Sequence, residues 1–600
     1  MRRFAIAALA GLTAVWAQAP VTISPDAYLA HIKYLASPEL KGRATGSPEL
    51  EKAANYIASQ FQAFGVKPVR GNSYQQAFTT TVGARMGVTN RLDITDDGKT
   101  TALAPPGGFI PFSFSSSGTA SAPVVFVGYG ITANEYHYDD YAGIDVKDKI
   151  VLLVRHEPQE NDDKSVFLGK ELTQHSTFAI KAVNAKMHGA RAVILVNDAY
   201  PHHTAAEDRL DPFGQATGPT DSGVLFVQVK ESTAEAWFKN EGRDLHEILD
   251  SIDKDLKPRS FPLTKLTVSM TLDIQHDMKT VHNVAAYIPG KTQEYVIIGA
   301  HYDHLGLGDE HSLAPSQIGT IHPGADDNAS GTAGVIELAR YFSGQPQQQR
   351  GILFITFAGE ELGLLGSNYY AAHPLLPLDN AVTMINMDMI GRIRGGKVYV
   401  NGTGTGSTLD KLVESVKPPA DFKLDLSEAT GYGGSDHMSF TVKQVPVLFF
   451  FSGLHGDYHK TSDTWDKIDA PDAAKLLGYV AQIATRLAND PERPKFQRVE
   501  KVAPVSSGSG RGYGPNFGSI PDFDEPPHGV RFADIQDGTP AAKAGLKAGD
   551  ILIEFDGKDI GNLYDFTYAL QAHKPGDEVL VKVLRGSQRI EAKVLLTERR

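Results

Sequence analysis

The chain has 600 residues, a formal net charge of −13 and no cysteine. The acidic balance argues against a nucleic-acid partner, because binding a polyanion requires a basic face, and the lack of cysteine excludes disulfides and a thiol nucleophile. A chain of this length exceeds a single domain, and its 41% hydrophobic content is ordinary for a globular α/β protein.

The N-terminus has the pattern of a secretory signal peptide, predicted to span residues 1–17. Two arginines precede a short apolar segment, and small residues follow it. Cleavage is expected after Ala17, because Pro20 would obstruct a cut after Ala19. The segment is short for a membrane span, and an uncleaved membrane anchor is the alternative. No other apolar run is long enough to cross a bilayer, so we expect a secreted or bacterial periplasmic protein without a membrane span after cleavage.

Two helices are predicted to open the mature chain. Ser24-Pro25 and Ser47-Pro48 each combine a capping serine with a proline suited to the first helical turn. Between them lies S-P-E-L-K-G-R-A-T-G-S (Ser37 to Ser47), whose glycine and arginine are expected to shape a loop. Short strands then dominate residues 118–260, and a helix-like stretch interrupts them. The strands are expected at Pro123 to Ile131, Lys149 to Val154 and Ala192 to Val196, and the helix at Phe178 to His188.

Three motifs then share one pattern, in which an apolar run or a glycine turn ends in acidic and imidazole side chains. They are V-I-I-G-A-H-Y-D-H-L-G (Val296 to Gly306), H-P-G-A-D-D-N-A-S-G-T-A-G (His322 to Gly334) and G-I-L-F-I-T-F-A-G-E-E-L-G (Gly351 to Gly363). Each places polar residues where a strand would meet a loop or the start of a helix. That is where open α/β sheets build their sites.

The polar residues at these strand ends form the ligand set of a hydrolytic metal. Two zinc ions that share one carboxylate account for them, with a gap for a bridging water. Three carboxylates and a hydroxide would balance the two dications, which leaves Glu360 beside a ligand as the natural general base. Asp463 is a candidate partner for His459. The predicted ligands are His301, Asp326 and Asp388 for one ion, and Asp326, Glu361 and His459 for the other.

The C-terminal part of the chain is predicted to be a separate small module. A glycine- and serine-rich stretch within residues 491–511 has the composition of a flexible linker. Beyond it lies D-G-T-P-A-A-K-A-G-L-K-A-G-D-I-L (Asp537 to Leu552), followed by a helical pattern that carries Leu563, Phe566 and Leu570, and then by closing strands.

The order H-x-D, G-A-D-D-N-A-S-G, G-E-E, N-M-D-M and Y-H-K-x-x-D-T resembles the zinc-dependent exopeptidases of the M28 family (aminopeptidase Y/S type). The resemblance implies an α/β, three-layer zinc-peptidase core of the phosphorylase/hydrolase-like type with a mixed sheet. It implies the same metal ligands, with Asp303 as the carboxylate that orients His301. It also implies a cis peptide bond between Asp326 and Asp327, and Tyr432 as the tyrosine that stabilises the oxyanion.

Two further resemblances complete the predicted organisation. Residues 118–260 resemble a β-rich protease-associated (PA) domain, and residues 512–600 resemble a PDZ domain, which binds extended peptide by strand addition, here around Phe517 to Ile520. The predicted segments are a signal peptide (1–17), a first peptidase part (22–117), the PA domain (118–260), a second, catalytic peptidase part (261–490), a linker (491–511) and the PDZ domain (512–600).

The resulting hypothesis is a two-zinc aminopeptidase that acts on peptides, with a possible peptide or C-terminal ligand at the PDZ domain. A carboxypeptidase and an acyl transferase of the glutaminyl cyclase type are competing hypotheses on the same fold. A non-catalytic binding protein built from the PA and PDZ domains is a third.

Overall fold

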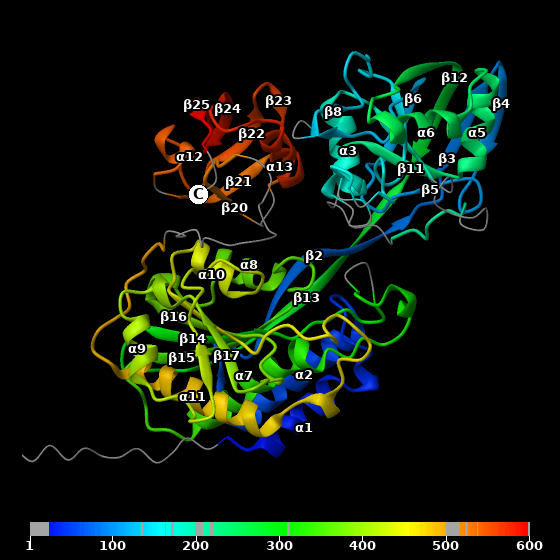
Figure 1. Cartoon of the computed structure of the whole chain (residues 1–600). Helices are drawn as coiled ribbons and strands as arrows, with labels where there is room; N and C mark the ends of the chain where they lie inside the picture. Colours follow the sequence, from blue (N-terminus) through cyan, green and yellow to red (C-terminus); the bar gives the residue numbers. More distant parts are fainter. Residues whose placement is uncertain are drawn as a thin grey trace, which may run out of the picture.

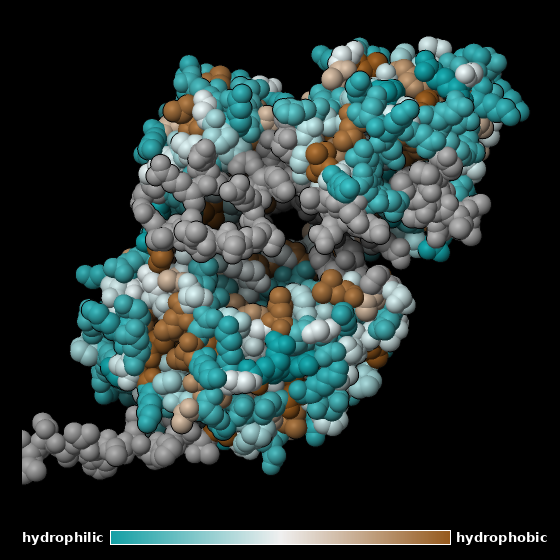
Figure 2. All heavy atoms as spheres, in the orientation of Figure 1, coloured by the Kyte–Doolittle hydropathy of each residue, from teal (hydrophilic) through white to brown (hydrophobic). Residues whose placement is uncertain are grey.

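The protein is seen in a computed structural model, which describes residues 23–133, 136–162, 164–167, 169, 173–197, 208–214, 221–308, 312–499, 515–522, 526–536 and 538–597. The described chain forms three bodies, each built on its own main sheet (Figure 1). On the face in Figure 2 hydrophilic residues predominate, with apolar residues in small groups. The described part of the chain contains no helix with the length and apolarity needed to span a bilayer. The predicted signal peptide lies outside the described residues.

The largest body holds a nine-stranded mixed sheet in the order β1-β13-β15-β14-β16-β19-β17-β18, with β2 paired to β13. Four neighbouring strands of this sheet are parallel, namely β15, β14, β16 and β19. The strands on either side of them, β13 and β17, run antiparallel. The strands are β1 (Lys67–Pro68), β2 (Gln75–Met86), β13 (Ile274–Ile288), β14 (Tyr295–His301), β15 (Gly351–Phe357), β16 (Ala381–Met387), β17 (Lys397–Asn401), β18 (Lys423–Asp425) and β19 (Val447–Phe451).

Helices cover both faces of this sheet, because its central strands are apolar on both sides. Along β14, Val296 and Ile298 belong to a core shared with one set of helices, whereas Tyr295 and Ile297 belong to a core on the opposite face. Figure 1 shows the strands between these two helical layers. One layer is α1 (Pro25–Leu35), α2 (Pro48–Ala63), α7 (Gly331–Ser343) and α11 (Ala470–Asn489), with α9 (Leu409–Ser415) beside it; the other is α8 (Leu365–Ala372) and α10 (His437–Val442).

The serines expected to cap the first two helices do so. The Ser24 hydroxyl accepts a hydrogen bond from the Ala27 N–H, and the Ser47 hydroxyl accepts one from the Leu50 N–H. Each helix has a proline in its first turn, where no N–H partner is needed. Both helices pack into the core that lies against the sheet.

A second body is inserted between β2 and β13, which pair antiparallel from Gln75–Val284 to Met86–Ile274. This long ribbon carries the chain out of the core and back (Figure 1). The inserted domain is wider than the predicted 118–260, since its eight-stranded sheet also takes in residues 91–111 and 261–272. The sheet is β4 (Lys99–Leu103), β3 (Arg91–Asp96), β12 (Phe261–Leu272), β6 (Gly118–Phe126), β9 (Ile150–Val154), β10 (Ala192–Val196), β11 (Leu225–Val229) and β5 (Ile110–Pro111), with a separate pair, β7 (Thr132–Ala133) and β8 (Tyr138–Asp139).

Helices α3 (Phe178–Met187), α5 (Glu231–Asn240) and α6 (Leu245–Asp255) complete the inserted domain. The third body has the sheet order β20-β21-β22-β24-β25, with β23 paired to β22. Its core is aromatic and aliphatic, centred on Phe532, Phe555 and Phe566. Its elements are β20 (Ser519–Pro521), β21 (Val530–Ile535), α12 (Pro540–Lys543), β22 (Ile551–Phe555), β23 (Lys558–Asp559), α13 (Leu563–Gln571), β24 (Glu578–Arg585) and β25 (Gln588–Leu595).

The described beginning of the predicted linker packs against its neighbours. Phe496 bridges to Gly406 of the core, and the Arg498 guanidinium donates to the Ile535 carbonyl of β21 at 2.7 Å. The glycine- and serine-rich part of the predicted linker lies outside the described residues. The α/β core with a mixed sheet, the inserted β-rich domain and the small C-terminal domain are confirmed.

Candidate metal centre

The site lies where parallel strands end. His301 is the last residue of β14, and Asp303 follows it; their side chains are 1% and 0% exposed. Asp303 Oδ1 lies 3.7 Å from His301 Nδ1 and accepts the Glu360 N–H at 3.1 Å. Its other oxygen accepts the Thr45 hydroxyl at 2.8 Å. Asp303 therefore connects the ends of β14 and β15, and its Oδ1 faces the His301 ring.

One carboxylate stands between two imidazoles, and it belongs to Asp327. Asp327 Oδ1 lies 3.4 Å from His301 Nε2, and Asp327 Oδ2 lies 3.2 Å from His459 Nε2. The residue sits in a π-helical turn, η6 (Ala325–Ser330), ahead of α7. A side chain that offers one oxygen to each histidine can serve two cations at once.

The prediction that Asp326 provides this carboxylate is corrected by one residue. Asp326 Oδ1 accepts the Gly391 N–H at 2.7 Å, and its Oδ2 lies 3.1 Å from His455 Nε2. The predicted cis bond between residues 326 and 327 is also displaced by one, because the cis bond joins Asp327 to Asn328. Asp327 has φ −103° and ψ 99°, which is not helical. The turn therefore sends the two carboxylates to different partners.

Asp463 anchors this turn, and its predicted partnership with His459 is not what the structure gives. Asp463 Oδ2 accepts the N–H groups of Asp326 and Asp327 at 3.0 and 3.1 Å. Asp463 is fully buried. Its carboxylate thus holds the backbone on which the two acidic side chains diverge.

The remaining predicted ligands lie around Asp327 in two groups. Asp388 Oδ1 lies 3.4 Å from His301 Nε2 on one side, and Glu361 Oε2 lies 3.1 Å from His459 Nε2 on the other. Ligand atoms of His301, Asp327 and Glu361 all lie within 4.8 Å of one another, as do those of His301, Glu360 and Asp388. Each group therefore offers imidazole nitrogen and carboxylate oxygen to a common volume.

The donor set fits two zinc ions. Zinc takes imidazole and carboxylate ligands. Here each ion would have one histidine, one acidic residue and one carboxylate oxygen of Asp327. His301 Nε2 and Asp388 Oδ1 are both buried without a hydrogen bond. Buried polar atoms normally have partners, so these atoms match a bound cation.

Glu360 lies on the His301 side of Asp327, with its Oε2 3.9 Å from His301 Nε2. Burial raises the pKa of Glu360 well above its ordinary value, and the negative charges of Glu361 and Asp388 act in the same direction. A carboxylate that gains a proton readily suits the role of a general base.

Neighbouring side chains brace the ligands. His304 Nδ1 lies 2.7 Å from Glu361 Oε1, and the Ser435 hydroxyl donates to Asp388 Oδ2 at 2.8 Å. His304 thus contacts a predicted ligand, and its place within the first motif was the only sign of this in the sequence. Asp436 is fully buried, and burial raises the pKa of Asp436 to about 7.

The two tyrosines near the site have different surroundings. Burial raises the pKa of Tyr432 to about 12, and the negative charge of Asp534, in β21 of the C-terminal domain, also raises it. Burial also raises the pKa of Tyr458, together with the charges of Asp327 and Glu361. The Tyr458 ring stacks on His459 with 3.8 Å between centroids. Sequence reasoning missed Tyr458, although it directly precedes a predicted ligand.

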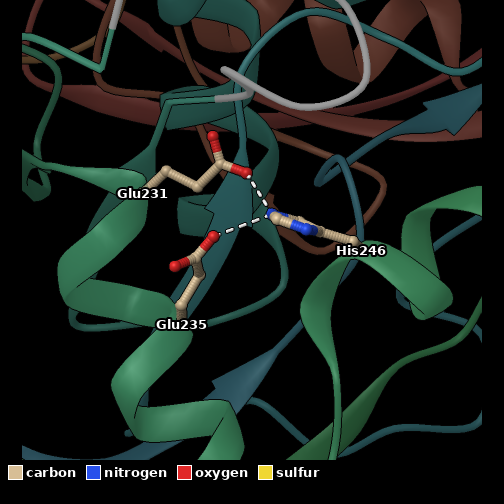
Figure 3. A group of neighbouring side chains, drawn as sticks. All are labelled: Glu231, Glu235 and His246. Carbon is tan, nitrogen blue, oxygen red and sulfur yellow. Dashed lines mark hydrogen bonds and ion pairs between the residues drawn. The ribbon is translucent and has the colours of Figure 1, made fainter. Parts of the chain in front are cut away.

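A third cluster of metal-ligand side chains lies in the inserted domain. His246 Nε2, from α6, points between the carboxylates of Glu231 and Glu235, one turn apart on α5 (Figure 3). The distances are 2.9 and 2.8 Å, and Glu235 is 44% exposed. When His246 is protonated, the imidazole forms an ion pair with both carboxylates, so the cluster accounts for itself without a metal.

Comparisons with known proteins agree with this architecture. Residues 283–484 match the model of peptidase family M28, residues 120–237 match the PA domain and residues 498–596 match the PDZ domain. Residues 283–484 are thus similar to peptidase family M28, and the other two matched segments are similar to the PA and PDZ domains.

Curated relatives cover part of the chain. A probable leucine aminopeptidase of Arthroderma otae is 31% identical over 214 residues, which are 34% of this chain and 56% of that protein. Aminopeptidase YwaD of Bacillus subtilis is 26% identical over 340 residues, which are 55% of this chain and 64% of that protein. The chain therefore spans less than two thirds of the length of these relatives.

Solved structures align over a longer stretch. An aminopeptidase from Aneurinibacillus sp. strain AM-1 has a TM-score of 0.49 at 25% identity and covers 80% of this chain and 97% of its own. A zinc aminopeptidase from Bacillus subtilis has a TM-score of 0.47 at 20% identity and covers 80% of this chain and 99% of its own.

Proposed function

We propose that this protein is a two-zinc aminopeptidase. The observation that carries the proposal is Asp327, whose two carboxylate oxygens face His301 and His459, each of which has its own acidic neighbour. Two ions held by these residues would supply Lewis acidity toward a peptide carbonyl and lower the pKa of water. The relatives named as aminopeptidases support the same reaction class.

The reaction assigns one task to each of three side chains. Glu360 takes a proton from the attacking water and passes it to the departing amine, which a carboxyl of raised pKa can do in both directions. The Tyr458 hydroxyl donates a hydrogen bond to the developing oxyanion. Asp303 keeps the His301 ring oriented. We assign to Tyr458 the role that the family resemblance gave to Tyr432, because the Tyr458 ring stacks on His459.

The local charges favour binding of a peptide amino terminus. Glu360, Asp388 and Asp436 all lie on the His301 side, and each is buried. Their carboxyl oxygens can accept hydrogen bonds from an α-ammonium group, whereas a C-terminal carboxylate has no hydrogen to donate to them. Arg392, beside His455, is paired with Asp457 at 2.7 Å. These acceptors therefore favour binding of an amino terminus over a carboxy terminus.

A cyclase and a binding protein would make different demands on the site. A cyclase-type acyl transferase with one working zinc has no use for a carboxylate shared between two complete ligand groups. A pure binding protein has no use for Glu360 beside them. The number of zinc ions bound, and the products formed from a peptide that begins with glutamine, separate these functions from an aminopeptidase.

We also propose that the chain is exported and that its PDZ domain binds peptide. Residues 1–17 have a signal-peptide pattern. Among the described residues the β20 strand pairs on one side only, which suits strand addition by a peptide on its other side. A peptide with a free C-terminus is the expected ligand.

Glu360→Gln tests the proposed reaction. The variant should retain two zinc ions, because Glu360 is not among the proposed ligands, yet lose turnover of an aminoacyl-nitroanilide by about 10²–10⁴-fold. Turnover, zinc content and activity on N-blocked peptides would be measured together. Undiminished turnover, or equal activity on N-blocked peptides, would contradict the proposal.

A further inference from the structure

We propose that the turn Lys41–Thr45 clamps the metal centre, with Arg43 as the positioning residue that holds the Asp327 turn against the end of β14. The inference rests on the proposed function, since it concerns how the zinc ligands are aligned. Arg43 contacts no ligand side chain among the described residues, and it would act through the backbone.

The Arg43 guanidinium joins two segments that are distant in sequence. It is 0% exposed. Its Nε donates to the Tyr302 carbonyl at 2.8 Å, between His301 and Asp303. Its Nη1 donates to the Pro323 carbonyl at 2.5 Å, and its Nη2 donates to the Gly324 carbonyl at 2.7 Å, at the entry to η6. One rigid group therefore fixes the distance between His301 and the turn that presents Asp327.

The backbone of the Lys41–Thr45 turn also packs closely against the segments that follow β14 and precede η6. A Cβ on Gly42 would lie 2.4 Å from the His322 carbonyl oxygen and 2.5 Å from that of Gly306. Arg43 itself has φ 42°, in the left-handed region that a non-glycine residue seldom adopts. The Thr45 hydroxyl adds the bond to Asp303. The surrounding contacts therefore hold Arg43 in a conformation that it would not choose alone.

The charge of Arg43 balances the acidic site. Its direct partners are carbonyls, so no carboxylate of the described residues neutralises it by contact. An arginine guanidinium is charged at neutral pH, and this one lies beside the turn that carries Asp327.

Lysine cannot replace this arrangement. Its single ammonium lacks the planar fork that reaches two segments from three nitrogens. Arg43→Lys keeps the charge but cannot keep both the Tyr302 bond and the Gly324 bond. We expect this variant to fold and to bind zinc about 10–100-fold more weakly, as for other residues that orient ligands from outside.

The control is Arg350→Lys. Arg350 is a buried arginine that donates to the Leu487 and Asp490 carbonyls, at 2.8 and 2.7 Å, and pairs with Glu294 away from the site. It should lose thermal stability but keep the zinc affinity of the wild type. The measurement is a chelator-competition titration of metal-free full-length protein, beside its melting temperature.

A second variant covers the case in which Arg43→Lys does not fold. Thr45→Val removes only the hydrogen bond to Asp303, and zinc affinity should fall several-fold with the melting temperature nearly unchanged. The clamp alone would be overturned if Arg43→Lys kept the zinc affinity of the wild type, or if Arg350→Lys lowered zinc affinity by the same factor. If Arg43→Lys is unfolded, an unaltered zinc affinity in Thr45→Val would overturn it. A wild-type chain that binds no zinc would overturn both the clamp and the proposed function.

Discussion

At the scale of single residues, one backbone turn gives two adjacent aspartates different partners. Asp326 and Asp327 have the same side chain and adjoining places in the sequence. Asp326 is bonded to Gly391 and faces His455, whereas Asp327 faces His301 and His459. The dihedral angles of η6 separate them, and Asp463 and Arg43 are hydrogen-bonded to the η6 backbone.

We expect Asp327→Asn and Asp326→Asn to differ sharply. Asp327→Asn should lose both zinc ions on dialysis, because an amide offers one neutral oxygen where two charged ones are needed. Asp326→Asn should keep both ions, since an amide oxygen can still accept the Gly391 N–H. Metal content after dialysis distinguishes the two variants. Zinc retained by Asp327→Asn and lost by Asp326→Asn would make Asp326 the shared ligand.

At the scale of secondary-structure elements, α13 of the C-terminal domain packs on α3 of the inserted domain. Lys186 Nζ lies 2.6 Å from Asp565 Oδ2, and the Asp565 side chain is 0% exposed. The Tyr568 hydroxyl bonds to the Asn184 side chain, and Met187 packs against the core of the C-terminal domain. The sequence predicted both helices but had no signal for their contact.

Lys186→Met should loosen this contact, because it leaves the Asp565 carboxylate buried with only backbone support. We expect a cost of about 1–3 kcal/mol in the free energy of unfolding. In the double variant with Asp565→Asn much of that stability should return, because no buried charge is left unpaired. Thermal unfolding of the four chains of this cycle measures the coupling. Strictly additive losses would contradict a direct ion pair between the domains.

At the scale of the whole molecule, the acidic chain buries several carboxyl groups whose protonation ties stability to pH. Asp140 in the inserted domain is 0% exposed and bonds to the Tyr129 N–H and the Ile131 N–H. Burial raises the pKa of Asp140 to about 7 from 3.8. The folded state therefore keeps a proton between these values that the unfolded state has lost.

Stability of the inserted domain should consequently fall as pH rises from about 4 to about 7, and should level above that range. Asp140→Asn carries no proton to lose, so the slope contributed by this group should vanish. Chemical denaturation of the full chain at several pH values measures the slope. A variant with the slope of the wild type would show that other groups carry the pH dependence.

Much of the architecture was accessible from sequence, because hydrophobic period and turn residues are local signals. The apolar run that becomes β14 and the capped α1 and α2 all lie where the patterns predicted them. The edges of the inserted domain were not accessible, since β3 and β12 are ordinary strands whose membership is decided by pairing with each other and not by composition.

The sequence alone determined which chemical groups are available, in what order, and that several of them end apolar runs, because these are properties of short segments. Tertiary structure alone decided that Asp327 and not Asp326 faces both histidines, and that Arg43 reaches Gly324. The reason is physical: each of these outcomes depends on the distance between segments far apart in the chain, and only packing sets that distance.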